Sequence, residues 1–401
     1  MKTYQQTSIT MRLMLTVLLL AATLASFVGC DPPANTNSSG NVSTTIGMLL
    51  PLGSETGTQA RKGAELALRE LNATSGPLQF EARWEDERGE PTAAGTRAEA
   101  LASDAKVLGI VGPINSGPAI AAADVANRQR LVLISPLAST PVLAKPHDFF
   151  FRTWTSDAAE AQFESGYARD ELRVNDLVIL HIGAAYGQDL AKAFAADFQS
   201  RGGRVVDTIE YPPDTQSFGP IVNRVISRSP QALYFVGYPP DIAEILREIR
   251  SRRVNFLILG AAIISDPSVF SLAGKNVEGV MFPFPATFDP TGTSAAMKKF
   301  TDDYKKANNE EPSFIAAQAY DATMLLGQAI KTARGTRSTM PTREEVEKAL
   351  DSIDRYDGAT GTFVFDDNGD AIRTFRMYEI RDGRMVPRET SRSAAAGSGA
   401  K

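Results

Sequence analysis

The sequence predicts an α/β protein made of two doubly wound lobes, each a parallel sheet with helices on both faces. From residue 44 onward, short runs of β-branched and apolar residues alternate with amphipathic stretches of helical length, which is typical of βαβ units. This alternation forms two successive series, and the second starts near residue 157. The segments after residue 277 extend neither series in simple order. We therefore expect the chain to return to the first lobe late and to cross between the lobes several times.

The first series predicts one sheet and its helices. Residues 44–52 (TTIGMLLPL) carry mostly β-branched and apolar side chains, so they are expected to form a buried strand. In the helix expected next, Ala64, Leu68 and Leu71 share one face. The predicted order is strand 44–52, helix 58–72, strand 78–85, helix 92–103, strand 107–112, helix 117–127 and strand 131–134.

The second series and the last part of the chain follow the same reasoning. The second series predicts helix 157–172, strand 177–182, helix 187–199, strand 204–211, helix 218–227, strand 232–237, helix 241–252 and strand 256–259. After it we expect strand 277–282, helices 294–308, 313–333 and 342–352, and a β-hairpin of 361–365 with 374–380. Asp367, Asn368 and Gly369 supply the turn signal of this hairpin.

Composition excludes several classes of function. The 401 residues are 43% hydrophobic and 22% charged, as in soluble globular proteins. The single cysteine excludes an intrachain disulfide framework and a Cys-based zinc site, and two histidines, His147 and His181, leave little for metal or acid-base chemistry. We expect no cofactor. A net charge of −5 argues against a nucleic-acid partner. The chain has no GxSxG elbow, no GxGxxG after its first strand and no complete P-loop, so we do not expect an enzyme.

The two ends of the chain are expected to lie outside the folded lobes. In residues 1–29, Lys2 and Arg12 precede an apolar run that is too short to span a membrane, which predicts a signal peptide. It ends in FVGC, which resembles a bacterial lipobox with Phe27 in place of the usual Leu, and the resemblance implies lipidation of Cys30. Residues 30–43 predict the lipidated cysteine and a flexible tether, and residues 389–401 a disordered tail.

A series of short motifs runs through the folded part. They occupy residues 46–52, 57, 63–67, 109–113, 134–136, 151–153, 186–187, 237–238, 319–322 and 361–370. In this order and spacing they resemble the branched-chain-amino-acid type of periplasmic substrate-binding protein over nearly all of residues 44–387. The resemblance implies the type I periplasmic binding protein fold: two Rossmann-like lobes joined by three hinge crossings, near 152–156, 279–284 and 357–362. The implied N-terminal lobe is 44–153 with 281–360, and the C-terminal lobe is 154–280 with 361–388.

The same resemblance implies a function. The protein would capture a small polar or carboxylate-bearing solute, such as an amino acid or an amide, and deliver it to an ABC transporter permease. It would lie on the periplasmic or extracytoplasmic face, anchored to the inner membrane through Cys30, since Asp31 resembles the retention signal of enterobacterial lipoproteins. The sequence leaves one alternative open: a lipid-anchored regulatory or sensory protein that uses this fold to control a cell-envelope enzyme or receptor.

Candidate site residues follow strand ends, where open α/β sheets bind their ligands. Residues 112–118 (GPINSGP) end a strand and open a helix, with Ser116 as the expected cap, and exposed N–H groups at a helix start attract anions. By resemblance, Ser116 would hold a solute carboxylate. The other positions that the resemblance places at the site are Ala138 and Ser139 on the carboxylate, Tyr186 and Tyr238 as aromatic walls, and Phe314 and Thr56 as looser cleft-lining positions.

Ala262 is the main departure from the family pattern. Amino-acid-binding relatives have an acidic residue there that pairs with the ligand ammonium, and an unpaired buried ammonium costs several kcal/mol. Two readings follow. Either another carboxylate, such as Asp266 or Glu55, compensates, or the solute is not a free α-amino acid; the methyl group of Ala262 favours the second reading.

Overall fold

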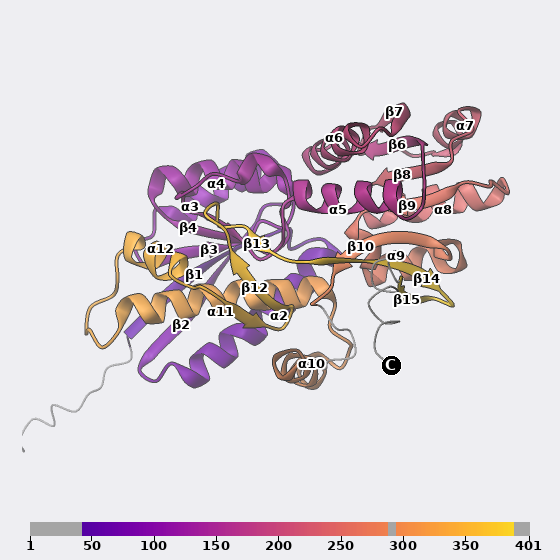
Figure 1. Ribbon diagram of the computed structural model, residues 1–401. Helices are drawn as coiled ribbons and strands as arrows, with labels where there is room; N and C mark the ends of the chain where they lie inside the picture. The colour runs from indigo at the N-terminus through magenta and orange to yellow at the C-terminus, as the bar shows by residue number, and fades with distance from the viewer. Residues whose placement is uncertain (1–41, 288–293, 389–401) are drawn as a thin grey trace, which may run out of the picture. The chain divides into compact units, whose positions relative to one another are not determined.

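The computed structural model describes residues 42–287 and 294–388. The predicted signal peptide, Cys30, most of the tether and the tail 389–401 lie outside the described residues. Within them, the chain forms two α/β lobes with a small third sheet (Figure 1). The predicted fold class is confirmed.

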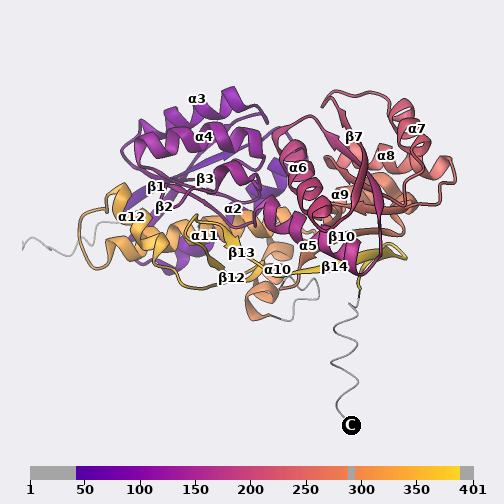
Figure 2. The same cartoon turned by 45° about the horizontal axis from the view of Figure 1, so that its top comes forward.

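The first lobe is built on a parallel sheet in the order β2-β1-β3-β4-β5. Its strands are β1 (Val42–Leu50), β2 (Leu78–Asp86), β3 (Val107–Val111), β4 (Val132–Ser135) and β5 (Phe150–Arg152). Its helices are α2 (Glu55–Thr74), α3 (Pro91–Ala102), α4 (Ser116–Gln129), α10 (Ala295–Asn308), α11 (Phe314–Arg334) and α12 (Arg343–Asp351). Figure 2 shows α3 and α4 on one side of the sheet and α11 on the other. Helices on both sides explain why every residue of β3 and β4 is buried.

The second lobe has a mixed sheet in the order β15-β14-β10-β9-β8-β6-β7. Its strands are β6 (Asp176–Ile182), β7 (Arg204–Tyr211), β8 (Ala232–Val236), β9 (Leu257–Gly260), β10 (Val280–Pro285), β14 (Phe375–Arg381) and β15 (Arg384–Pro387). Helices α5 (Asp157–Asp170) and α6 (Ala185–Ser200) pack on one face, and α7 (Gly219–Ser227), α8 (Pro239–Ser251) and α9 (Pro267–Ala273) on the other. Strand β14 runs antiparallel to β10 and β15, while the other pairs are parallel (Figure 1).

The predicted C-terminal hairpin is only partly correct. The turn at 366–370 joins β12 (Gly361–Phe365) to the two-residue strand β13 (Ala371–Ile372), and β12 also pairs with β11 (Tyr356–Gly358). The second predicted arm becomes β14 and pairs with β10 in the other sheet. The turn signal is local and holds, whereas the partner of a strand depends on distant residues.

The lobe connections also differ in part from the expectation. Within the described residues, the chain leaves the first lobe after β5, returns between β10 and α10, and leaves again between β13 and β14. The predicted boundary at 281 falls inside β10, which belongs to the second sheet. The boundary at 360 precedes β12, whose Phe363 packs in the first core. The first lobe therefore resumes after Pro285 and ends near Ile372.

Two buried arginines hold these connections in place. Arg152, at the end of β5, donates from Nε to Asp370 at 2.6 Å. Arg373, between β13 and β14, donates to the carbonyl oxygen of Thr153 at 3.0 Å and lies 4.3 Å from the ring centre of Phe363. Each arginine joins a segment next to one crossing to a segment next to another, so the crossings are coupled.

Candidate functional site

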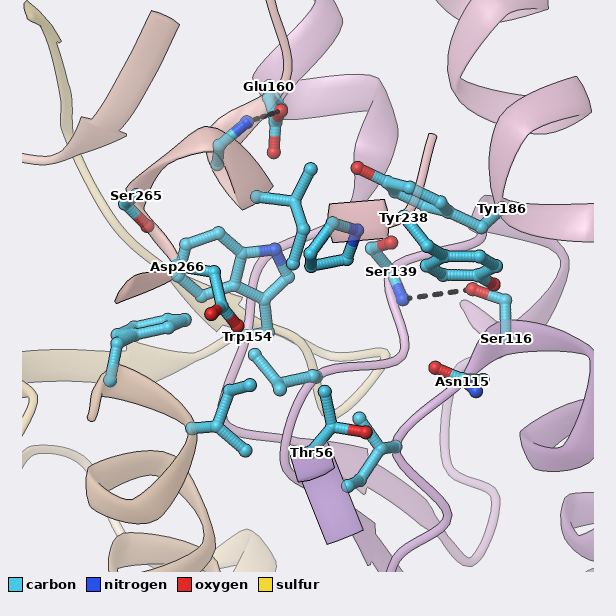
Figure 3. A pocket seen from close by; sticks show the side chains of 17 residues that line it. Thr56, Asn115, Ser116, Ser139, Trp154, Glu160, Tyr186, Tyr238, Ser265 and Asp266 are labelled. Carbon is cyan, nitrogen blue, oxygen red and sulfur yellow. Dashed lines mark hydrogen bonds between the residues drawn. The ribbon is translucent and has the colours of Figure 1, made fainter. Parts of the chain in front are cut away.

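A cavity lies between the two lobes, next to the strand ends from which several helices begin (Figure 3). The cavity and the solvent at its mouth occupy about 710 Å³. Seven of the eight predicted site residues line it. The full lining is Thr56, Ile114, Asn115, Ser116, Leu137, Ser139, Trp154, Glu160, Tyr186, Tyr238, Pro239, Ala262, Ile263, Ser265, Asp266, Phe314 and Ile315.

Most of the predicted lining residues stand at the start of a helix. The first N–H groups of a helix have no partner inside it, and they carry the positive end of the helix dipole. The positions are Thr56 in the first turn of α2, Ser116 at the start of α4, Tyr186 in the first turn of α6, Tyr238 as the N-cap of α8 and Phe314 at the start of α11. Helices from both lobes thus direct polar N-termini toward one cavity.

Ser116 is not the N-cap of α4 that the sequence suggests. The cap is Asn115, and Ser116 is the first helical residue. The Ser116 Oγ atom accepts a hydrogen bond from the Ser139 N–H at 3.4 Å, which joins the two loops that carry these serines. Because the Ser116 hydroxyl only accepts in this hydrogen bond, its proton remains available to donate a hydrogen bond into the cavity.

The loop before α4 requires a glycine. Gly112 has φ +104°, and a Cβ atom there would lie 1.9 Å from the Leu49 carbonyl oxygen. Ser135 then ties this loop to the next one, because its Oγ donates to the Pro113 carbonyl at 2.6 Å and accepts the Ala138 N–H at 2.9 Å. Ala138, the one predicted site residue outside the cavity lining, thus has its N–H paired with Ser135.

Tyr186 and Tyr238 form an aromatic wall from the second lobe. Their rings stack with centroids 5.8 Å apart and an angle of 25° between the planes. Gly187 lets α6 begin close to the strand before it, since a Cβ there would lie 2.3 Å from the Ile182 carbonyl oxygen. Burial raises the pKa of Tyr238 to about 12, so its hydroxyl stays protonated at neutral pH and can donate a hydrogen bond.

Aromatic residues line another part of the cavity. The rings of Trp154 and Phe314 meet edge to face at 4.9 Å and 71°, and Phe284 meets Phe314 at 5.0 Å and 68°. Trp154 lies in the crossing after β5 and was not among the predicted site residues. Its position inside the expected hinge segment 152–156 was the signal that could have identified Trp154 as a site residue. This wall suits an apolar part of a ligand.

The structure brings a carboxylate to Ala262 that the sequence analysis missed. Glu160, in the first turn of α5, accepts the Ala262 N–H on Oε1 at 2.8 Å and is 2% exposed (Figure 3). Asp266, one of the two carboxylates suggested to compensate for the missing acidic residue at position 262, also lines the cavity. Glu55, the other suggestion, is exposed and does not line it.

Burial is the largest influence on the pKa values of the three acidic residues on α5, and it raises all of them. It raises the pKa of Glu160 to about 7, against a smaller lowering by the Ala262 N–H. It also raises the pKa values of Asp157 and Glu164 well above their usual range, and the charge of Glu160 raises both further. These residues share one face of α5 at spacings of three and four. The helix thus presents a strongly acidic buried face beside the cavity.

The described residues contain no cluster of three or more His, Cys, Asp or Glu side chains that could hold a metal ion. His181 is buried at the end of β6, with Nδ1 3.0 Å from the Ile182 carbonyl oxygen, and does not line the cavity. No helix within residues 42–287 and 294–388 has the length and apolar character needed to cross a bilayer.

Comparison with known proteins agrees with this architecture. The family model for periplasmic binding proteins matches residues 43–384. The chain belongs to this family. The predicted resemblance is thereby confirmed, and so is the prediction that the protein binds a substrate and is not an enzyme. Membership also implies an extracytoplasmic location.

Individual relatives are of the branched-chain amino acid type. A Leu/Ile/Val-binding protein homolog of Brucella melitensis is 26% identical over 351 residues, which cover 85% of this chain and 92% of the relative. The leucine binding protein LivK of Thermotoga maritima shares 26% identity with a TM-score of 0.78, covering 86% of this chain and 98% of that one. LivJ of Streptococcus pneumoniae, solved in complex with isoleucine, shares 25% identity with a TM-score of 0.76, covering 86% and 100%.

Proposed function

We propose that this periplasmic binding protein captures a small carboxylate-bearing solute between its lobes and delivers it to an ABC transporter permease. The observation that carries the proposal is the cavity itself, to which both lobes contribute helix N-termini and hydroxyl groups. Such a site binds an anionic group without a cationic side chain, because the N–H dipoles supply the positive potential. The branched-chain specificity named for the relatives supports a solute of amino-acid size.

The lining suggests how the solute docks. Its carboxylate would lie at the start of α4, against the hydroxyl groups of Ser116 and Ser139 on the first lobe. Tyr186 and Tyr238 would cover it from the second lobe, and the aromatic wall at Trp154 would take its apolar part. Because these groups belong to different lobes, the solute favours the closed arrangement by its extra contacts there.

We further propose that the protein works at the outer face of the inner membrane, held there by lipid on Cys30. The support is the lipobox resemblance at the end of the signal-like segment, together with the tether that follows it. If residues 30–43 form the tether that their composition predicts, the lobes would reach a permease in the same membrane. Mass spectrometry of the membrane fraction tests this: we expect an acylated N-terminal Cys30, and an unmodified chain free in the periplasm would contradict it.

The function is tested by calorimetry on the purified chain 42–401, which contains both lobes. We expect saturable one-site binding of at least one amino acid or amino-acid-sized carboxylate, and weaker binding by Ser116→Ala with unchanged thermal unfolding. Ser103→Ala, at the C-cap of α3 and away from the cavity, is the matched control. Lack of binding by every amino acid and carboxylate in the panel would contradict the proposal.

A further inference from the structure

A side-chain hydrogen bond joins the two lobes beside the cavity. Thr140 lies in the first lobe, in the segment between β4 and β5, and its hydroxyl donates to Oδ2 of Asp189. Asp189 belongs to α6 of the second lobe, which lies against α4 of the first lobe (Figure 2). Neither residue lines the cavity. The bond therefore connects the lobes without forming part of the cavity wall.

We propose that Thr140 and Asp189 form a closure latch, a hydrogen bond that is made when the lobes close and broken when they open. The latch populates the closed arrangement even without solute, and it slows the opening of the lobes around a bound solute. Asp189 is then a positioning residue, which acts on the solute through the arrangement of the lobes. The effect on bound solute rests on the function proposed above, whereas the effect on the solute-free protein can be measured by itself.

Thr140 is fixed on the first lobe through both its backbone and its side chain. Its carbonyl oxygen accepts a hydrogen bond from Arg152 Nη1 at 2.9 Å, and the residue is fully buried. Its Oγ1 atom also accepts the Val142 N–H at 3.2 Å, as the cap of the short 3₁₀ helix Pro141–Leu143. Because this contact uses a lone pair of Oγ1, the hydroxyl proton remains available for Asp189. The first lobe thus holds the donor of the latch in place.

The acceptor of the latch moves together with the aromatic wall of the cavity. Asp189 follows Tyr186 by three residues on α6, so the two side chains lie on the same side of one helix. On the first lobe, Thr140 directly follows Ser139, which lines the cavity. A motion that brings Tyr186 over Ser139 therefore also brings Asp189 to Thr140. The latch forms in step with the closing of the solute site.

The chemistry of the bond sets the size of the expected effect. Its acceptor is a carboxylate, and hydrogen bonds to charged groups are stronger than neutral ones. Asp189 is only half-buried, and opening the lobes returns both groups to water, which offsets part of the lost bond. We therefore expect loss of the latch to lower the ratio of closed to open protein by about five- to tenfold.

Single-molecule fluorescence energy transfer on the purified chain 42–401 tests the latch. This chain has no cysteine, because Cys30 precedes it, so Asp124→Cys on α4 and Ser200→Cys on α6 place one label on each lobe at exposed positions. Without solute, we expect a measurable closed population in the otherwise unchanged protein. Asp189→Ala should reduce that population about five- to tenfold, through faster opening. Absence of a closed population before this substitution, or equal populations with and without it, would overturn the latch.

Further variants separate the latch from a structural effect. Thr140→Ser keeps the hydroxyl group and should keep the populations, whereas Thr140→Val should reduce the closed population as Asp189→Ala does. Combining Thr140→Val with Asp189→Ala should cost no more than Thr140→Val alone, since both remove the same bond, and additive losses would contradict the pairing. Gln188→Ala is the matched control. It removes a hydrogen bond from the same helix to Glu210 at 2.9 Å, which stays inside the second lobe, and it should leave the populations unchanged.

Calorimetry with leucine, valine and phenylalanine relates the latch to the solute. Because Asp189 does not line the cavity, Asp189→Ala should weaken every one of these amino acids that binds by the same factor, within about twofold. Tyr186→Ala removes part of the cavity wall, so its factors should differ between solutes. Solute-dependent factors for Asp189→Ala would contradict a positioning role. If none of the three amino acids binds, the proposed function is contradicted for this solute class, and the populations of the solute-free protein still decide the latch.

Discussion

The buried ion pair of Arg152 and Asp370 links the stability of the lobe connections to the shape of the cavity. Arg152 is fully buried, and Asp370 lies in the turn between β12 and β13. Besides this pair, Arg152 Nη1 donates to the carbonyl oxygens of Ala138 and Thr140 at 3.2 and 2.9 Å. Asp370→Asn removes the negative charge at nearly constant size. The guanidinium then remains buried without a counter-ion.

The loss of unfolding free energy in Asp370→Asn depends on the cost of leaving the Arg152 guanidinium buried and unpaired. Breaking a buried ion pair by removing one partner costs about 3–5 kcal/mol. Burial raises the pKa of Asp370 in spite of the neighbouring arginine, so the intact pair does not fully offset the cost of burying the carboxylate. The loss in Asp370→Asn should therefore come from the stranded arginine. Adding Arg152→Met to it should cost clearly less than the two single substitutions summed.

Urea unfolding at pH 7 measures these differences, with Asp357→Asn as the control. Asp357 pairs with Arg355 next to the same small sheet, but both side chains are exposed, at 60% and 64%, so we expect little change. Calorimetry should also show weaker solute binding by Asp370→Asn, because Arg152 supports the loop that carries Ser139. A loss of unfolding free energy below about 1 kcal/mol, the ordinary value of an exposed ion pair, would refute the reasoning.

Further predictions concern the cavity and the acidic face of α5. Ser116→Ala should weaken solute binding by about 1.5–3 kcal/mol, the value of a hydrogen bond to a charged group, without lowering the thermal midpoint; wild-type affinity in calorimetry would contradict its role. Tyr186→Ala should weaken binding about tenfold by removing the stacked wall, and an unchanged dissociation constant would exclude this. For Glu164→Gln, the sign follows from a folded-state pKa raised well above 4.5: wild-type stability falls as pH rises above 4.5, and the variant escapes this loss. Thermal unfolding should thus show the variant more stable than the wild type at pH 8 and equal to it at pH 4, and equal midpoints at both would contradict the burial effect.

The sequence predicted the cavity better than the chain connections, and the reason is physical. Ser116, Tyr186 and Tyr238 each follow a strand and open a helix, and both features are set by residues nearby in the chain. Carboxyl ends of parallel strands meet at one edge of a sheet, so local signals were enough to place Ser116 at that edge of the first sheet and the two tyrosines at that edge of the second. Strand β14 was predicted at nearly its observed position but with the wrong partner, because β10 lies about 90 residues earlier in the chain and the pairing has no local sequence signal.

Glu160 shows why one essential-looking group was missed. On an amphipathic helix, an acidic residue is ordinarily read as part of the solvent face. Here Asp157, Glu160 and Glu164 instead point into the lobe, against tyrosines of α6 and β8. The Glu160 carboxylate contacts Ala262, which lies 102 residues away in the chain. Periodicity alone cannot distinguish a buried acidic stripe from an exposed one, because both recur every three to four residues.

The contact between Glu160 and Ala262 shows why solute specificity is difficult to predict from a single position of the sequence. A binding site needs a charge at a place in space, and any element that reaches that place can supply it. An alanine at the expected position therefore says little until the neighbouring helix is known. Here the backbone N–H of Ala262 donates to the carboxylate of Glu160 from α5, so an acidic group lies beside position 262 although the residue at that position carries no charge. If Glu160→Gln changes the affinity for the solute in calorimetry while Ala262→Ser leaves it unchanged, the acidic group on α5, and not the side chain of residue 262, contributes to recognition of the solute.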